Sequence, residues 1–236
     1  MKKSKKTVDA GRYNRDKELL SSHYSQYYRD YPDGVTLPPE IAELVDKNMI
    51  RLLIRLARYK FVARIVKPSD TVLDVGCGLG LGDIFLGQHA GHVTGIDIRE
   101  HEIAEARSVN RRDNVTFKVI DLYNLPRNRK FDVVIALDVI EHMAVEDGRK
   151  LLKAMATHLK PDGMAVIGTP SIYSYPYQGH LSQAGHIKCY DQKELTDLME
   201  SVFGRTVALS MNDEVVHTGH PKMSWYYFVL AFNPKK

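Results

Sequence analysis

Short apolar runs alternate with longer segments of helical periodicity along most of the chain. The runs predict strands at about 71–75, 92–97, 115–120, 131–137, 163–168, 205–210 and 224–231, and the segments between them predict helices near 80–90, 100–111, 145–160 and 191–203. This alternation indicates an α/β fold with a Rossmann-like, doubly wound, mostly parallel sheet of seven strands. The last two strands have no full helix between them, so we expect them to pair antiparallel as a terminal hairpin.

The chain before the first strand is predicted to form two further regions. Residues 1–36 are polar and rich in tyrosine, and they form either a cap over a bound ligand or a surface arm. Residues 37–67 have helical periodicity with a break near Asn48 and a stop at Pro68, which predicts a helical layer packed on the sheet. Residues 68–236 then form the sheet domain.

The composition is that of a soluble globular protein. Hydrophobic residues make up 44% and charged residues 26% of the 236 positions. No secretory signal is visible, and the apolar runs are shorter than the roughly 18 residues that a membrane span needs. Cys77 and Cys189 form neither a disulfide framework nor a metal-type pair, so we expect a reducing, cytoplasmic environment.

The net charge of +4 is concentrated in two basic segments. The first lies in a tail that we expect to be disordered, and contains Lys2, Lys3, Lys5 and Lys6. The second recurs at helical spacing, which favours a solvated helix face over a nucleic-acid footprint, and contains Arg51, Arg55, Arg58, Arg64 and Lys67. Nucleic acid is therefore an unlikely partner.

Residues 71–97 follow the order of a nucleotide-binding βαβ unit. An apolar run opens into a turn with Gly76, Gly78 and Gly80, followed by a helix and a second apolar run that ends at Asp97. Glycines at these positions let the backbone take positive φ and approach a ligand closely. Asp97 would present a carboxylate to a ribose diol, so an adenosine-type cofactor is expected.

The details of the turn argue against a dinucleotide. The dinucleotide pattern is G-x-G-x-x-G, whereas the spacing here is Gly76-x-Gly78-x-Gly80. Asp74, just before the turn, is poorly suited to a pyrophosphate and well suited to a neighbouring ammonium group. From about Thr71 to Leu230 the chain resembles the class I S-adenosylmethionine-dependent methyltransferases, whose first motif looks like residues 73–80 and which carry a terminal hairpin.

The resemblance implies a set of contacts with S-adenosyl-L-methionine. Asp97 would accept hydrogen bonds from both ribose hydroxyls, Asp121 would accept from the adenine amino group, and Leu122 or Ile98 would pack on the adenine ring. The cofactor-binding positions implied are Asp74, Gly76, Cys77, Gly78, Gly80, Asp97, Ile98, Asp121, Leu122 and Asp138.

Polar residues also gather after the fourth and fifth strands. Asp138, Glu141 and His142 are spaced so that they share a face in a helical turn, and His186 follows the fifth strand. This pattern resembles the ubiquinone-type O-methyltransferases and the small-RNA 3′-end 2′-O-methyltransferases. The resemblance to the RNA enzymes implies a divalent metal on these four side chains, although Asp138 stands where the family usually has Glu.

Three roles remain open for this cluster. A metal would lower the pKa of a hydroxyl nucleophile, and the ligand types fit Mg²⁺, Mn²⁺, Fe²⁺ or Zn²⁺. Alternatively, His142 or His186 is the catalytic general base, because imidazole titrates near neutral pH. The third interpretation is structural, with Glu141 and His142 positioning backbone and His186 capping a helix.

The acceptor is expected to be a small molecule or a glycan. Tyr173, Tyr175, Tyr177 and Gln178 offer aromatic faces and hydrogen-bond donors that suit a sugar, and the polar segment 211–222 would cover the acceptor site. We therefore predict an O-methyltransferase acting on a diol-bearing molecule. The alternatives are an RNA 3′-end enzyme, a non-catalytic cofactor-binding module and an NAD-linked oxidoreductase, and the oligomeric state is open.

Overall fold

A computed structural model describes residues 10–235, so the four lysines of the expected tail lie outside the described residues. The chain divides into two compact units between Leu37 and Pro38. The first unit contains helix α1 (Ala10–Asp30), which the polar pattern did not predict. No helix among the described residues has both the length and the apolar character that crossing a membrane requires.

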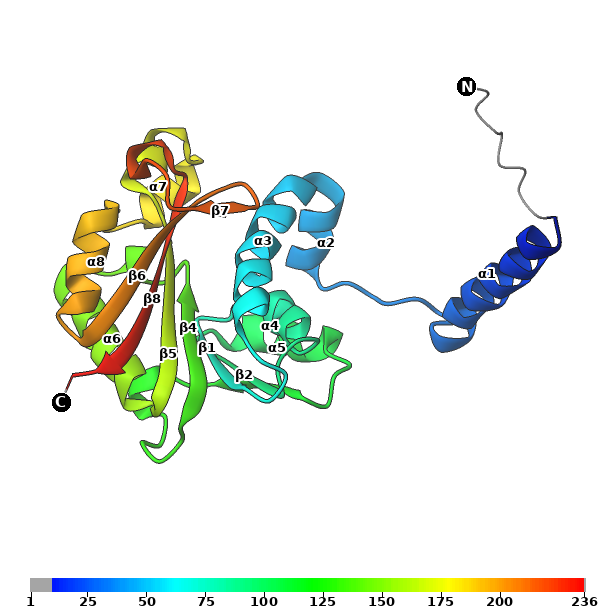
Figure 1. Ribbon diagram of the computed structural model, residues 1–236, viewed down its shortest axis with the longest axis horizontal. Coiled ribbons are helices and arrows are strands. Elements are labelled where there is room, and N and C mark those ends of the chain that lie inside the picture. The colour runs from blue at the N-terminus through cyan, green and yellow to red at the C-terminus, as the bar shows by residue number, and fades with distance from the viewer. Residues whose placement is uncertain (1–9, 236) are drawn as a thin grey trace, which may run out of the picture. The chain divides into compact units, whose positions relative to one another are not determined.

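The second unit is built on one eight-stranded sheet, coloured from cyan through green to red in Figure 1. Its order is β3-β2-β1-β4-β5-β8-β6-β7; pairs among the first five are parallel and the remaining pairs antiparallel. The strands are β1 (Thr71–Val75), β2 (His92–Asp97), β3 (Val115–Val119), β4 (Phe131–Leu137), β5 (Leu159–Pro170), β6 (Phe203–Asn212), β7 (Val215–His217) and β8 (Tyr226–Pro234). The predicted α/β class, the parallel sheet and the antiparallel hairpin are confirmed.

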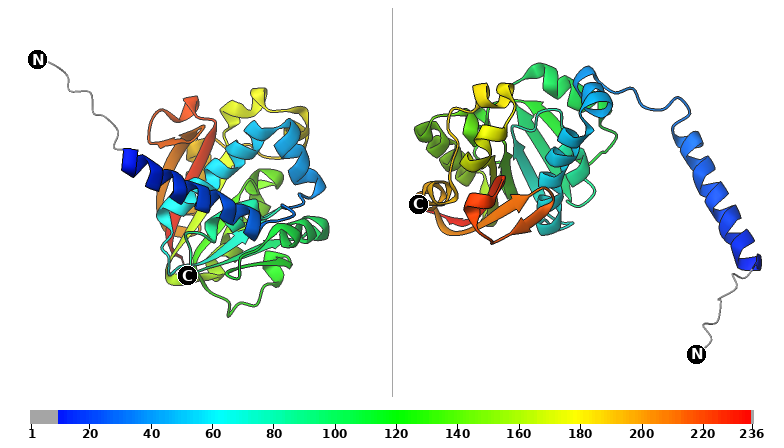
Figure 2. Two further views of the ribbon diagram at one scale, coloured as in Figure 1. Left: turned by 90° about the vertical axis from the view of Figure 1, so that its right-hand side faces the viewer. Right: turned by 90° about the horizontal axis from the view of Figure 1, so that it is seen from above.

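Helices cover both faces of this sheet (Figure 1, Figure 2). One face packs against α3 (Met49–Ile65), α4 (Leu81–Leu86) and α5 (Glu100–Val109), and the other against α6 (Val145–Thr157) and α8 (Gln192–Glu200). Side chains of a strand alternate between faces, so Val72 joins one core cluster and its neighbour Leu73 the other. Both faces are buried, which explains the nearly continuous apolar runs of the parallel strands.

The sheet has eight strands rather than the predicted seven. The additional strand, β7, has three residues and pairs with β6 inside the segment 211–222. A strand this short leaves too few positions for alternation to be recognised. The short helix α7 (His180–Gly185) was not predicted for the same reason.

The predicted helical layer is present before the sheet. Helix α2 (Pro39–Lys47) is followed at Asn48 by α3, and α3 ends before Pro68. Ile41 and Leu44 of α2 form a small apolar cluster with Leu79 of the glycine turn. The layer therefore supports the turn that follows β1.

Asp132 fastens the start of β4 to both neighbouring strands. Its Oδ2 accepts from the backbone N of Thr71 at 2.8 Å, from Thr71 Oγ1 at 2.7 Å and from Lys160 Nζ at 2.7 Å. Burial acts to raise the pKa of Asp132. The hydrogen bonds from Lys160 and Thr71 together outweigh it and lower this pKa to about 2.

We expect Asp132→Asn to lower the free energy of unfolding by about 1 kcal/mol at neutral pH, allowing for the partial exposure of the carboxylate. A carboxyl group whose pKa is depressed on folding stabilises the protein above its unfolded pKa. The difference between variant and wild type should therefore shrink as the pH falls from about 4 towards 2. Urea denaturation at several pH values measures it, and an equal difference at every pH would contradict this role.

Candidate functional site

The glycines of the turn after β1 let neighbouring groups come close to its backbone. Gly76 has φ +76° and donates its N–H to Ile96 O at 2.8 Å. A Cβ at Gly76 would lie 2.6 Å from a methyl group of Val139, which follows β4. Neither the backbone conformation nor the space permits a larger residue here, so the tips of β1, β2 and β4 come together around this turn.

Asp97, the last residue of β2, lies beside the glycine turn. Its Oδ2 accepts the N–H of Gly78 at 3.1 Å, and its Oδ1 accepts the backbone N–H of Arg99 at 2.9 Å. Arg99 also pairs with Glu102 at 2.6 Å, and Glu102 lies against Gly78. Oδ1 also accepts from Arg99 Nε at the longer distance of 3.4 Å, so Oδ2 is the oxygen of Asp97 that keeps an unused lone pair.

The structure distinguishes the two residues predicted to cover an adenine ring. Ile98 is 70% exposed at the tip of β2, whereas Leu122 is 4% exposed and packs in the core. Asp121 accepts the N–H of Tyr123 at 3.1 Å and so begins a short 3₁₀ helix. Ile98 is therefore the residue available to a planar ligand.

Beneath the glycine turn lies a fully buried acidic pair that sequence reasoning did not find. Asp74 of β1 and Asp83 of α4 are both 0% exposed, and the hydroxyl of Tyr59 donates to Asp74 Oδ2 at 2.8 Å. Burial raises the pKa of Asp74 to about 7, against the opposing effect of hydrogen bonds from Tyr59 and Asp83. Burial and the neighbouring Asp74 raise the pKa of Asp83 well above its usual range.

The loop after β4 begins with Asp138, whose backbone φ of +58° is unusual for a residue other than glycine. Its carboxylate forms an ion pair with Arg58 of α3, and the Arg58 guanidinium lies 4.3 Å from the centre of the Tyr226 ring. The basic spacing of α3 predicted a solvated face, yet the Arg58 side chain is only 17% exposed. No sequence pattern indicated this ion pair between positions 58 and 138.

Three of the four predicted metal ligands come together. Glu141, His142 and His186 each offer a ligand atom, and these atoms lie within 4.8 Å of one another. Asp138 lies outside this group and is paired with Arg58 instead. The helical turn expected at 138–142 covers only residues 140–142, which separates Asp138 from the other three.

The immediate contacts of these three side chains fix their chemistry. Glu141 is fully buried; its Oε2 accepts from Thr169 Oγ1 at 3.0 Å, while its Oε1 has no hydrogen-bond partner among the described residues. His142 Nδ1 lies 2.8 Å from Gly185 O, and a carbonyl only accepts, so Nδ1 carries the proton and Nε2 keeps a lone pair. His186 Nδ1 is buried and likewise lacks a partner among the described residues.

Burial favours the uncharged forms of both Glu141 and His186. Burial raises the pKa of Glu141, whereas the nearby His142, Thr169 and Arg58 act in the opposite direction. Burial, His142 and Arg58 lower the pKa of His186, so its imidazole is neutral over a wider pH range. A neutral imidazole has the lone pair that a metal ligand or a general base needs.

The aromatic loop after β5 lies beside the terminal hairpin. Tyr177 is 75% exposed and packs against Trp225 with ring centres 5.6 Å apart, and the Tyr175 hydroxyl donates to Gln183 O at 3.3 Å. Glu214, in the segment 211–222, forms an ion pair with Lys60 of α3. This segment therefore connects with the helical layer, and Trp225 is an aromatic residue that the sequence did not single out.

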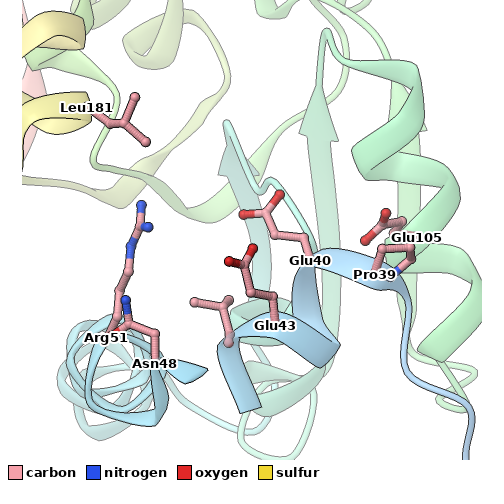
Figure 3. Close-up of a pocket in the computed structure, with 8 residues that line it drawn as sticks. Pro39, Glu40, Glu43, Asn48, Arg51, Glu105 and Leu181 are labelled. Carbon is pink, nitrogen blue, oxygen red and sulfur yellow. The ribbon is translucent and has the colours of Figure 1, made fainter. Parts of the chain in front are cut away.

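A pocket of about 490 Å³ lies between α2, α3, α5 and α7. Figure 3 shows Arg51 extending toward Leu181 across the opening, with Glu40, Glu43 and Glu105 on other walls. The pocket is lined by Pro39, Glu40, Glu43, Leu44, Asn48, Arg51, Glu105 and Leu181. Its carboxylates give it an acidic character.

Part of the chain is similar to a known family. Residues 72–163 match the family described as a methyltransferase domain. Phosphoethanolamine N-methyltransferase 1 of Zea mays is 31% identical over 168 residues, which are 66% of this chain and 32% of that protein. The ubiquinone biosynthesis O-methyltransferase of Rickettsia canadensis is 36% identical over 100 residues, 42% of each chain. The chain thus spans only about a third to a half of the length of the curated relatives it matches.

Solved structures share the fold. A protein from Pyrococcus horikoshii superimposes with a TM-score of 0.63 at 21% identity, over 89% of this chain and 99% of that one. Magnesium protoporphyrin IX methyltransferase from Synechocystis, with S-adenosylhomocysteine bound, gives a TM-score of 0.55 at 19% identity, over 90% and 94% of the two chains. At these identities the likeness shows the fold alone.

Proposed function

Because residues 72–163 match a methyltransferase domain, we propose that this chain is a class I S-adenosylmethionine-dependent methyltransferase that moves a methyl group to a hydroxyl of a diol-bearing small molecule or glycan, with a sugar as the favoured acceptor. The observation that supports it best is the convergence of Glu141, His142 and His186 behind β4. This cluster follows the same strand whose tip packs on the glycine turn.

The donor would lie across the tips of the first three strands in chain order. The unused lone pair on Oδ2 of Asp97, together with Oδ1 once its long contact to Arg99 Nε is given up, would suit the ribose diol, and the exposed side chain of Ile98 would suit the adenine ring. Asp121 lies at the end of β3, where its carboxylate would face the adenine amino group. Ligands of open α/β sheets bind beyond these carboxyl ends.

A divalent metal fits the cluster behind β4. The unpartnered Oε1 of Glu141 and Nδ1 of His186 are buried atoms without a hydrogen bond among the described residues, and Nε2 of His142 has a lone pair. One carboxylate and two imidazoles are a common donor set for Mn²⁺, Fe²⁺ or Zn²⁺ and suit Mg²⁺ less well. When bound, the metal would supply Lewis-acid chemistry that lowers the pKa of an acceptor hydroxyl.

The protein's own side chains would perform the remaining steps. Thr169 fixes the carboxylate of Glu141, and Gly185 fixes the ring of His142. Methyl transfer is an in-line displacement, so holding donor and acceptor in line supplies much of the rate. Without a metal, the free Nε2 of His142 or the neutral ring of His186 would take the hydroxyl proton.

A second candidate function is methylation of an amine. The acidic pocket with Glu40, Glu43 and Glu105 would attract a cationic acceptor, and one relative is named a phosphoethanolamine N-methyltransferase. An amine is a nucleophile once deprotonated and does not need a metal. Turnover of an amine by metal-free protein would favour this alternative.

We expect Asp97→Ala to weaken binding of S-adenosylhomocysteine by about 100-fold, because the carboxylate that would accept charge-assisted hydrogen bonds from the ribose is lost. Isothermal titration calorimetry measures the change. Asp113→Ala, which removes an exposed carboxylate between α5 and β3, is the matched control and should bind normally. Wild-type affinity in Asp97→Ala would show that the donor does not lie at β2.

His186→Ala should leave S-adenosylhomocysteine binding unchanged and lower kcat by about 100-fold or more, because it removes a group that activates the acceptor and no group that holds the donor. The control is His180→Ala, an exposed histidine of α7. Calorimetry and a methyl-transfer assay with a panel of catechols and sugars separate the two effects. Full turnover by His186→Ala would remove this histidine from the mechanism.

Chelation distinguishes the two mechanisms. If Glu141, His142 and His186 bind a metal, dialysis against a chelator should lower turnover by about 10-fold or more, and Mn²⁺ should restore it in the wild type but not in Glu141→Gln. Paramagnetic resonance of added Mn²⁺ gives a readout that does not depend on activity. Unchanged turnover after metal removal would assign proton transfer to the histidines alone.

A further inference from the structure

Asp74 and Asp83 form a carboxyl pair that no part of the proposed chemistry has used so far. Both side chains are completely buried, Asp74 on β1 and Asp83 in the first turn of α4, and each is close enough to change the pKa of the other. Other described groups donate no hydrogen bond to Asp74 Oδ1 or to either oxygen of Asp83. Two ionised carboxylates cannot share so small a buried space.

Among the residues that the structure describes, no cation changes the pKa of either carboxyl group. The side chains that face the pair are neutral or acidic. They are Tyr59 of α3, Cys77 of the glycine turn, Asp97 of β2 and Tyr226 of β8. An isolated buried carboxylate is costly unless donors surround it. At least one of the two carboxyl groups must therefore carry a proton.

The position of Tyr59 decides which carboxyl is ionised. Its hydroxyl donates to Asp74 Oδ2 at 2.8 Å, and its ring lies over Gly82, where a Cβ would be only 2.2 Å away. Gly82 thus admits the tyrosine that stabilises charge on Asp74. Asp83 has no such donor from another side chain, so the proton belongs on Asp83.

We propose that Asp83 is a positioning residue: it stays uncharged and, together with Tyr59, donates a hydrogen bond to Asp74, so that Asp74 keeps the negative charge that faces the ammonium group of the methyl donor. The inference rests on the proposed function, because it needs a donor with an amino-acid moiety above the turn. Asp74 lies two residues before Gly76, so a donor bound above the glycine turn would have its amino-acid moiety near this charge.

The charge on Asp74 then links donor affinity to pH. An ammonium group favours the ionised form of Asp74, so donor binding weakens as the pH falls below the pKa of Asp74 in the free protein. Removing either hydrogen-bond donor makes ionisation of Asp74 harder and moves this loss of affinity to higher pH. An amide at position 83 still donates to Asp74.

The test measures the affinity for S-adenosylhomocysteine by calorimetry between about pH 5.5 and 9 in the wild type and three variants. The wild-type affinity should fall by about tenfold per pH unit below about pH 7. Asp83→Asn should keep this profile within about threefold. In Asp83→Leu and Tyr59→Phe the fall in affinity should begin at a higher pH, and binding at pH 7 should be weaker by about tenfold.

Two controls separate this inference from general damage. The ligand 5′-methylthioadenosine lacks the ammonium group, so its affinity should not follow the same pH profile in any variant. Asp162→Asn, which changes an exposed carboxyl group in β5, should behave as the wild type. Circular dichroism and thermal melting establish that each variant is folded, and Tyr59→Phe provides the test if Asp83→Leu does not fold.

Infrared spectroscopy tests the protonation directly and needs no ligand. The wild type should show the carbonyl band of a buried protonated carboxyl group at pH 8, and Asp83→Asn should lose it. The inference is overturned if this band is absent, if Asp83→Asn binds as weakly as Asp83→Leu, or if Tyr59→Phe keeps the wild-type profile. If S-adenosylhomocysteine binds with no pH dependence, only the inference fails, whereas no binding at any pH would reject the proposed function as well.

Discussion

The hydrogen bond from the backbone N–H of Gly78 to Asp97 is the contact on which the arrangement of the strand ends around the glycine turn depends. It joins the turn after β1 to the tip of β2, so the strand ends meet around one opening instead of separating. Gly76 completes the arrangement, because only a residue without a side chain leaves room for Val139 behind β4. The parallel sheet places these ends at one edge, and the backbone of the turn lies across that edge, where open α/β sheets bind their ligands.

The sequence was sufficient to predict the parts that follow from local pattern. Strand and helix order, the antiparallel hairpin, the break at Asn48 and the glycine turn all depend on periodicity or on backbone requirements of single residues. Adjacent placement of Glu141 and His142 was also predictable from spacing, and the approach of His186 followed from the family resemblance.

The contacts that the sequence did not reveal join distant positions. Arg58 and Asp138 are 80 residues apart, and the basic spacing of α3 resembles that of any solvated helix. Asp83 looked like an ordinary polar residue near the start of a helix, where acidic residues are common. Only the packing of α4 against β1 shows that its carboxyl group is buried beside Asp74.

Helix α3 touches four separate parts of the molecule with four consecutive residues. Arg58 pairs with Asp138, Tyr59 donates to Asp74, Lys60 pairs with Glu214 of the hairpin, and Phe61 packs on Phe228 of β8 at 4.4 Å between ring centres. A helix turns by about 100° per residue, so these four neighbours point in different directions. Each side chain therefore contacts a different part of the protein. Helix α3 is therefore part of the same packed unit as the sheet, and exchanging it between relatives would require the matching loop, strand and hairpin residues to be transferred with it.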